Sequence, residues 1–310
     1  MQDQIKSPDL IKYLVSSIKS ESPTAVVSYL DFKIDPTGKN KKDPSKLELA
    51  AFTKFLELST YRVTSTVQME QIQDLRILHG VDANEMLGST LRNESDVNTS
   101  KIIFDLMKEL GEKSRRNRFT KFQVLLNKYL GYEPKETIGD WRGETSKTLT
   151  SKIFLHSQLI AEKSRRGPGN FVMLSPELCS ILMDSPRFEY HMNDGSPLKA
   201  GLFDYIGKIG NIKVFRNLYT KDPEEIIMGR SMSEAPGILH VYMEPVIQEK
   251  ETPPDPNIKP QKTIELFNRM AIVAVGNSPE DFYQRILISR SGKHNIFTHL
   301  IDLLKSKFKK

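Results

Sequence analysis

The sequence predicts an α+β protein whose strands come from distant parts of the chain. Three observations favour this class: two long helical segments, an extended pair near the N-terminus that is rich in β-branched and aromatic residues, and several short apolar runs in the second half. Helices combined with strands from separate segments of the chain are typical of the α+β class.

The composition is that of an ordinary globular protein. Its 310 residues are 38% hydrophobic and 27% charged, enough for one large domain or two smaller ones. No run of about 18 apolar residues is present to span a bilayer, and the N-terminus lacks the apolar core of a secretory signal. The single cysteine, Cys179, excludes an intramolecular disulfide and a cysteine-based metal site. We therefore expect a soluble protein made in a cytoplasm.

Basic residues gather at four places along the chain. The formal net charge is +6, a modest excess that suits contact with polyanions without identifying one. The clusters fall at 39–46, 113–121, 163–166 and 305–310, each in a predicted loop or at a helix end. In most chains such clusters are simply solvated.

The N-terminal part predicts a helix followed by a long hairpin. Residues 8–20 repeat apolar side chains at helical spacing and are followed by Pro23. From Thr24 the pattern alternates, then a segment with two Asp-Pro steps and four lysines follows, and a second extended segment covers 47–67. We expect a hairpin arm with a basic tip, which either packs on its own domain or reaches another chain.

One long helix is predicted to start after Asp82 and to stop at Gly111. Asp82 and Glu85 form a capping box, and the glycine offers a left-handed stop. The apolar residues of this helix cluster near its two ends, with the polar run NESDVN at 93–98 between them. No core would hold that middle, so we expect the helix to lie across the outside of a domain as a spine.

A second helix, several short strands and a basic tail follow. Residues 148–165 have helical spacing, with a buried stripe that includes Ile153 and Ile160. The strand candidates are FVML, IKVFRN, EIIMGR, GILHVYME, NRMAIVAVG and FYQRILI. Residues 291–310 predict a basic amphipathic helix that packs on its own domain, on a partner protein or on a membrane surface.

The motif EKSRR occurs at 112–116 and at 162–166, each time at the end of a predicted helix. The residues after the two copies differ, so they are not an internal repeat. Phosphate loops place their glycines before a helix N-terminus, whereas the glycines of the second copy follow a helix and precede a strand. We therefore interpret Gly167 as the left-handed helix cap and Pro168 as the stop.

The sequence predicts no enzyme, no metal site and no cofactor. His294 and His299 are the closest histidine pair, but a separation of five residues places them on different faces of a helix. Walker A, GxGxxG, HExxH and GxSxG patterns are absent from the sequence. Trp141 and the scattered tyrosines do not form the periodic stacking platform of a single-strand binder.

Two segments carry a family resemblance. The stretch EQIQDLRILHGVDANEMLGSTL resembles the segment that leads into the spine helix of the major capsid proteins of T-even-type myoviruses, and SRRGPGNFVMLSPEL resembles a second segment of that family. The matching residues of the first are Gln73, Asp74, Leu75, His79, Gly80, Asp82, Ala83 and Leu87. Those of the second are Arg165, Arg166, Gly167, Gly169, Asn170, Phe171 and Ser175.

The resemblance implies an HK97-type major capsid fold with an E-loop hairpin, a spine helix in the P-domain, and an A-domain. The parts would be an N-terminal arm (1–23), the E-loop (24–68), the P-domain (69–147 and 262–290) and the A-domain (148–261), followed by the amphipathic tail (291–310). In that fold the E-loop lies over a neighbouring subunit. The tip lysines expected to contact that subunit are Lys39, Lys41, Lys42 and Lys46.

The resemblance also implies a function. The chain would assemble with copies of itself into hexamers, and into pentamers as a further option, to form an icosahedral or prolate head shell around the double-stranded DNA of a tailed phage. DNA contacts would be non-specific, and scaffold, portal, decoration and vertex proteins would be further partners, with no membrane. The location would be the virion capsid, assembled in the host bacterial cytoplasm. Alternatives are a vertex protein or an encapsulin-like nanocompartment shell of the same fold and, from a different class, a nucleic-acid-binding module.

Overall fold

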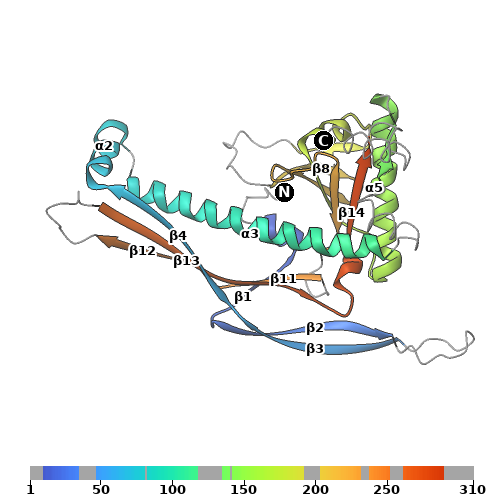
Figure 1. The fold of residues 1–310 in the computed structure, drawn as a ribbon, viewed down its shortest axis with the longest axis horizontal. Coiled ribbons are helices and arrows are strands. Elements are labelled where there is room, and N and C mark those ends of the chain that lie inside the picture. Colours follow the sequence, from blue (N-terminus) through green and yellow to red (C-terminus); the bar gives the residue numbers. More distant parts are fainter. Residues whose placement is uncertain are drawn as a thin grey trace, which may run out of the picture.

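A computed structural model describes residues 10–34, 47–80, 82–117, 135–139, 142–191, 203–231, 237–251 and 261–289. The described strands form a two-stranded hairpin, a long five-stranded sheet and a compact seven-stranded sheet. Figure 1 shows the hairpin below the long sheet and the compact sheet beside helices at one end of the molecule. Helix α3 (Ala83–Arg116) runs over the long sheet into the compact part. The predicted α+β class is therefore confirmed. The predicted C-terminal helix lies outside the described residues.

The hairpin forms where the alternating pattern predicted it. β2 (Thr24–Ile34) and β3 (Leu47–Glu57) pair antiparallel over their full length. Ala25 and Val27 on its inner face are buried against the long sheet, because successive side chains of a strand point to opposite faces. Outside the described residues lie the four tip lysines, Lys39, Lys41, Lys42 and Lys46.

The segment predicted as one strand over 47–67 is two strands. Its second half, β4 (Ser59–Gln68), leaves the hairpin and pairs antiparallel with β13 (Gln261–Val275). β13 also pairs with β11 (Gly237–Tyr242) and β12 (Val246–Glu251). The long sheet therefore joins strands from both halves of the chain, beneath α3 in Figure 1.

The helix predicted over 8–20 is wrong in its second half. α1 spans only Leu10–Leu14, and Ser16–Lys19 form β1, which pairs in parallel with β11. The helical spacing correctly predicted α1, which buries Ile11 and Leu14 in the core beside α3. Beyond α1, pairing with a strand more than 200 residues away outweighs a weak local preference for helix.

α3 continues past the glycine that was predicted to end it. The helix has 34 residues, and Gly111 lies inside it. A Cβ on this glycine would lie 2.9 Å from the backbone nitrogen of Arg285 in β14 (Tyr283–Ser289). The glycine is therefore explained by the close approach of helix and strand and not by a turn.

The polar run 93–98 of α3 is exposed or half-buried except at Ser95, so the expectation that no core would hold it is wrong at this one residue. Ser95 and Thr99 are both buried against β13. The Asn268 side-chain amide donates a hydrogen bond to Ser95 Oγ at 2.9 Å, and Thr99 Oγ1 donates to the Ser95 carbonyl at 2.8 Å. Polar hydroxyls are tolerated at this position because they have hydrogen-bond partners.

The compact part is a mixed sheet in the order β5-β14-β10-β6-β9-β8-β7. Besides β14, its strands are β5 (Glu136–Thr137), β10 (Glu225–Gly229), β6 (Phe171–Leu174), β9 (Ile212–Asn217), β8 (Phe203–Ile209) and β7 (Phe188–Tyr190). Its helices are α5 (Arg142–Ser164) and α6 (Pro176–Met183), with the short 3-10 helix η2 (Pro279–Phe282) before β14. The strands β6, β9 and β10 lie within the predicted candidates and β14 extends one residue beyond its candidate, whereas β5, β7 and β8 were not predicted.

Helices cover both faces of this compact sheet. In β6, Val172 and Leu174 pack toward α5 and α6, while Phe171 and Met173 pack toward α1 and α3. Strands covered on both faces read as continuous apolar runs, which explains why FVML was recognisable in the sequence. The compact sheet takes β14 from the C-terminal part, and the long sheet takes β11 and β12, so the sheets exchange segments across the predicted domain boundaries. The domain division itself stays a prediction.

Candidate assembly interface

The second motif segment, residues 165–170, forms the turn from α5 into β6. α5 ends at Ser164, and the left-handed residue directly after it is Arg165, with φ 54°. The Arg165 amide donates to the Ala161 carbonyl at 2.9 Å. The interpretation of Gly167 as the helix cap is therefore wrong, because this glycine, with φ 110°, shapes the loop two residues later.

The glycines of this turn leave room for neighbouring groups. A Cβ on Gly167 would lie 3.0 Å from the guanidinium of Arg230, whose Nη1 donates to the Pro168 carbonyl at 2.6 Å. A Cβ on Gly169 would lie 3.0 Å from Cδ1 of Ile160. Both glycines thus permit close packing, and their arrangement agrees with a structural turn.

Asn170 fixes the start of β6 between its neighbours. Its Nδ2 donates to the Ser231 carbonyl at 2.8 Å, and its Oδ1 accepts from the Ser231 amide at 2.9 Å. The Asn170 amide donates to the Gly229 carbonyl at 3.0 Å, and its own carbonyl accepts from the Lys213 amide at 2.9 Å. The hydrogen bonds of Asn170 therefore connect the start of β6 to the chain segments on both of its sides.

Arg166 links the turn to the hairpin. Its Nη2 donates to the Leu30 carbonyl at 2.9 Å and lies 3.5 Å from Oδ1 of Asp31. The other carboxylate oxygen of Asp31 accepts from the backbone amide of Asn277, two residues after β13, at 2.8 Å. We call Leu30, Asp31, Arg166 and Asn277 the arm anchor. It joins the hairpin, the α5–β6 turn and the long sheet within one chain.

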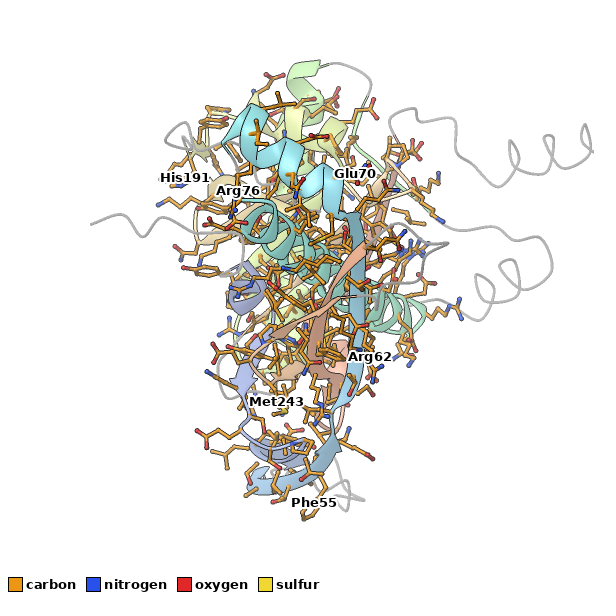
Figure 2. All side chains as sticks on the ribbon, turned by 90° about the vertical axis from the view of Figure 1, so that its left-hand side faces the viewer. Phe55, Arg62, Glu70, Arg76, His191 and Met243 are labelled. Atoms are coloured by element: carbon orange, nitrogen blue, oxygen red, sulfur yellow. The ribbon has the colours of Figure 1, made fainter. Side chains whose placement is uncertain are left out.

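The outer face of the hairpin carries exposed apolar side chains. Val26 and Phe55 lie directly opposite each other in the register and are 61% and 79% exposed. Leu30, on the same face of β2, is 44% exposed. Figure 2 shows Phe55 at the lower end of the molecule, on the hairpin. We call Val26, Leu30 and Phe55 the outer arm face.

The first motif segment lies on α2 (Met69–His79) and the turn after it. Gly80 has φ 63°, and its amide donates to the Arg76 carbonyl at 3.1 Å, so it ends α2 as a left-handed cap. Gln73 and Asp74 are exposed on the helix, and the side chain of His79 is outside the described part. α2 itself was not predicted as a helix.

Asp82 stands immediately before α3, where the sequence predicted the helix to begin. Its carbonyl accepts from the Met86 amide at 3.0 Å. Figure 1 places α2 at one end of α3 and the compact sheet at the other. The two motif segments therefore do not form a single site.

A buried charge network joins α3 to the compact sheet. Arg285 on β14 donates to Glu225 on β10, and its Nη1 donates to Glu112 on α3 at 2.8 Å. Lys108 Nζ lies 2.9 Å from the buried Glu225 carboxylate. Burial opposes ionisation of Glu112, but the hydrogen bond from Arg285 and the neighbouring arginines hold its pKa below the ordinary value.

Sequence reasoning missed this network, although a signal was present. Glu225 opens the apolar run EIIMG, and Arg285 interrupts the apolar run YQRILI. Charged residues inside two otherwise buried strands require partners, because an unpaired buried charge is costly. Both strands were predicted from their apolar residues. Because one carries a glutamate and the other an arginine, their pairing could have been predicted as well.

A second, partly buried cluster of Glu136, Lys152 and His156 fixes the short strand β5 to α5. Nε2 of the buried His156 lies 2.9 Å from one carboxylate oxygen of Glu136, and Lys152 Nζ lies 3.0 Å from the other. Although burial alone would raise it, these partners lower the pKa of Glu136 to about 2. The contacts stabilise the edge of the sheet, and the described residues hold no cluster of side chains suited to a metal ion.

The remaining expectations of absence can be compared only with the part of the chain that the structure describes. Within it, no helix has both the length and the apolar character needed to cross a membrane. Cys179 is buried, and burial raises the pKa of its thiol to about 12, so it is held as a neutral core residue.

Curated proteins that resemble this chain are phage capsid proteins. The major capsid protein of Vibrio phage KVP40 is 24% identical over 146 residues, covering 47% of this chain and 28% of the relative. That of Enterobacteria phage T4 is 24% identical over 128 residues, covering 41% of this chain and 25% of the relative. The chain thus matches only about a quarter of the length of these curated relatives. A solved structure from Microbacterium phage Oxtober96 aligns with a TM-score of 0.49 and 12% identity, covering 93% of this chain and 95% of that chain.

The family model for the major capsid protein Gp23 matches residues 14–237. This range covers more than half of the chain and includes the hairpin, α3 and most of the compact sheet. The chain therefore belongs to the Gp23 major capsid protein family. The resemblance to the major capsid proteins of T-even-type phages is confirmed.

Proposed function

We propose that this chain is a major capsid protein whose copies assemble into the capsomers of a phage head shell. Family membership supports the class, and the outer arm face carries the assembly step. A two-stranded hairpin is marginally stable on its own. Its inner face packs on the long sheet, while Val26 and Phe55 remain mostly exposed on the other. Exposed apolar side chains grouped on one face favour contact with another protein.

The contact would be head-to-tail. The hairpin extends along one side of the molecule (Figure 1), and we propose that a neighbour covers it with a different surface of its own. Contacts of this kind close into rings when the rotation permits, and hexamers or pentamers are such rings. The contact of the E-loop tip lysines with a neighbour belongs to this proposal, as does the division into parts 1–23, 24–68, 69–147 with 262–290, 148–261 and 291–310.

The shell would enclose double-stranded DNA in an icosahedral or prolate head. A net charge of +6 supports non-specific contact with phosphates, which needs no base recognition. The work of the protein is mechanical: its subunit interfaces must hold against packaged, self-repelling DNA, and no residue is assigned a catalytic role. Assembly in the host bacterial cytoplasm, and contacts with scaffold, portal, decoration or vertex proteins, are further parts of the proposal.

The test compares the wild-type chain with Phe55→Ser by electron microscopy and sedimentation velocity. We expect rings, tubes or shells from the wild type and small species from the variant, because the substitution removes the largest apolar side chain of the outer arm face without opening the core. Leu155→Ser is the matched control, since this leucine on α5 is 52% exposed. Thermal unfolding of both variants should match the wild type.

A wild-type chain that stays monomeric at high concentration would contradict the proposal. Equal loss of assembly in the Phe55 and Leu155 variants would show that the arm has no special part in it. Particles that contain only pentamers would identify a vertex protein, and shells filled with protein would identify a nanocompartment. Tight DNA binding by a monomer, with strong salt dependence, would identify a nucleic-acid-binding module.

A further inference from the structure

The strand β4 forms an open edge of the long sheet. It pairs antiparallel with β13 over all 10 of its residues, in one uninterrupted register. In the described part of the chain, no strand pairs with its other side. Figure 1 shows β4 running from α2 towards the hairpin. The backbone N–H and C=O groups along the open side are therefore a template for pairing with a further strand.

The other edges of the described sheets are protected against such pairing. β1, β5 and β7 have only 4, 2 and 3 residues. β12 carries Lys250 between two glutamates, and the hairpin strands carry Lys33 and Lys54. Short edge strands and charged residues, lysine above all, hinder pairing between chains. β4 has neither protection, because it is long, contains no lysine or proline, and has Arg62 as its one charged residue.

The residues of β4 suit pairing with the same strand of a second copy. A two-fold axis perpendicular to the sheet makes two copies of β4 antiparallel and brings side chains of the same face together. With Thr64 on the axis, Tyr61 lies opposite Val67 and Arg62 lies opposite Thr66. An aromatic residue opposite a β-branched one stabilises antiparallel strands, whereas like charges directly opposite destabilise them. This register provides the first and avoids the second.

We propose that β4 pairs with β4 of a second copy across this two-fold axis, so that two long sheets join into one. A two-fold contact uses the same surface on both copies, and it therefore leaves neither β4 edge open to a third chain. It is a different contact from the head-to-tail one of the outer arm face. The pairing stands without the arm contact, and its use in joining one ring to the next rests on the proposed function.

Cysteine cross-linking of the purified full chain tests the pairing. The native Cys179 is buried, so an added exposed cysteine is the one that oxidises. Directly opposite residues of antiparallel strands have Cβ atoms about 4.5–5.5 Å apart, close to the span of a disulfide. Under mild oxidation we expect Thr64→Cys to form a covalent dimer about tenfold faster than an unpaired cysteine, because pairing raises the local thiol concentration.

Gln248→Cys is the matched control. Gln248 of β12 and Thr64 of β4 are both register partners of Glu265, one on each side of β13, and both are exposed. The two cysteines would thus lie at the same level of the sheet and on the same face, at opposite edges. Gln248→Cys should form the dimer only at the slow rate of random collision, as read on non-reducing gels.

Arg62→Cys and Thr66→Cys test the register. With Thr64 on the axis, the two copies of residue 66 are four residues apart along the paired strands, about 13 Å at roughly 3.3 Å per residue. Neither variant should therefore link to itself. An equimolar mixture of the two should form the disulfide heterodimer, because residues 62 and 66 lie opposite each other.

Equal rates for Thr64→Cys and Gln248→Cys would overturn the proposal, and an edge reserved for a different protein would give that result. Rapid linking of Thr66→Cys to itself would overturn it as well. Adding Phe55→Ser to Thr64→Cys separates this inference from the proposed function. The dimer should form at an unchanged rate even where rings are lost, whereas a dimer that disappears with the arm contact would exclude an independent two-fold pairing.

Discussion

The two EKSRR segments have the same five residues and different structures. The copy at 112–116 stays helical to its last residue, whereas the copy at 162–166 leaves its helix after Ser164. The first is followed by Asn117 and the second by Gly-Pro-Gly, which cannot continue a helix. The conformation of the motif is therefore set by the residues that come after it and not by its own residues.

The surroundings also give the two copies different tasks. In the first copy, Glu112 forms ion pairs with arginines. Ser114 is buried, and its Oγ accepts a hydrogen bond from Nε2 of Gln284 at 2.7 Å. In the second, Arg166 reaches the hairpin through the arm anchor. The copies even meet, because Lys163 Nζ donates to Ser114 Oγ at 2.9 Å. One copy fixes the spine helix to the compact sheet, and the other fixes the arm.

Arg285→Leu should have the largest effect, because it breaks the contact between the first copy and the sheet. Among the described residues, the variant leaves the buried Glu225 with Lys108 as its remaining charged partner beside the Thr220 hydroxyl, and it removes a partner of Glu112. Removing one member of a buried charge pair costs about 3–5 kcal/mol. Urea denaturation of the unassembled chain should show this loss in the free energy of unfolding.

Lys113→Ala provides the control from the same copy. Lys113 pairs with Glu109 on the surface of α3, with both side chains more than half exposed. Such a pair contributes little, so we expect an unchanged denaturation midpoint. If Arg285→Leu and Lys113→Ala had the same midpoint, the buried network would not hold the helix to the sheet.

Gly111→Ala should have a smaller effect, at the residue just before the first copy. Its Cβ would meet the backbone of Arg285 at 2.9 Å, so helix and strand would have to separate, at a cost of about 1–3 kcal/mol. Gly88→Ala lies in the same helix, but its Cβ would meet only Cδ1 of Ile247 at 3.4 Å. There alanine should stabilise by up to about 1 kcal/mol. Thermal or urea unfolding with shifts of the same sign for both variants would contradict this explanation.

Gly111 also illustrates how far the sequence allowed the fold to be predicted. Apolar runs predicted the buried strands β6, β9, β10 and β14, and the alternating segment from Thr24 predicted the hairpin. A glycine in a helical pattern predicted a helix end, but a tertiary contact explains it. The conversion of 16–19 into a strand was likewise decided by a partner far along the chain.

The candidate site was less predictable than the fold. The exposed pair Val26 and Phe55 has the same alternating pattern as the buried residues of the hairpin, and only the packing of the opposite face shows which side is free. The arm anchor joins Asp31, Arg166 and Asn277 from three distant segments, and no local pattern brings them together. Gly80, the left-handed cap of α2, was named in the sequence only as part of the family motif, although its conformation is a local property.

Arg166→Ala should give the smallest loss among the destabilising variants, about 1 kcal/mol, because it removes one charge-assisted hydrogen bond at the base of the arm. Hydrogen exchange should detect it more clearly, as faster exchange of the amides of 24–34 through local opening. Arg165→Ala is the control, since the side chain of this neighbour is exposed to solvent. If the amides of 24–34 exchanged at the same rate in both variants, the arm anchor would not hold the hairpin. If Arg166→Ala left exchange unchanged and still blocked assembly, the arginine would act on a neighbouring subunit and not on its own arm.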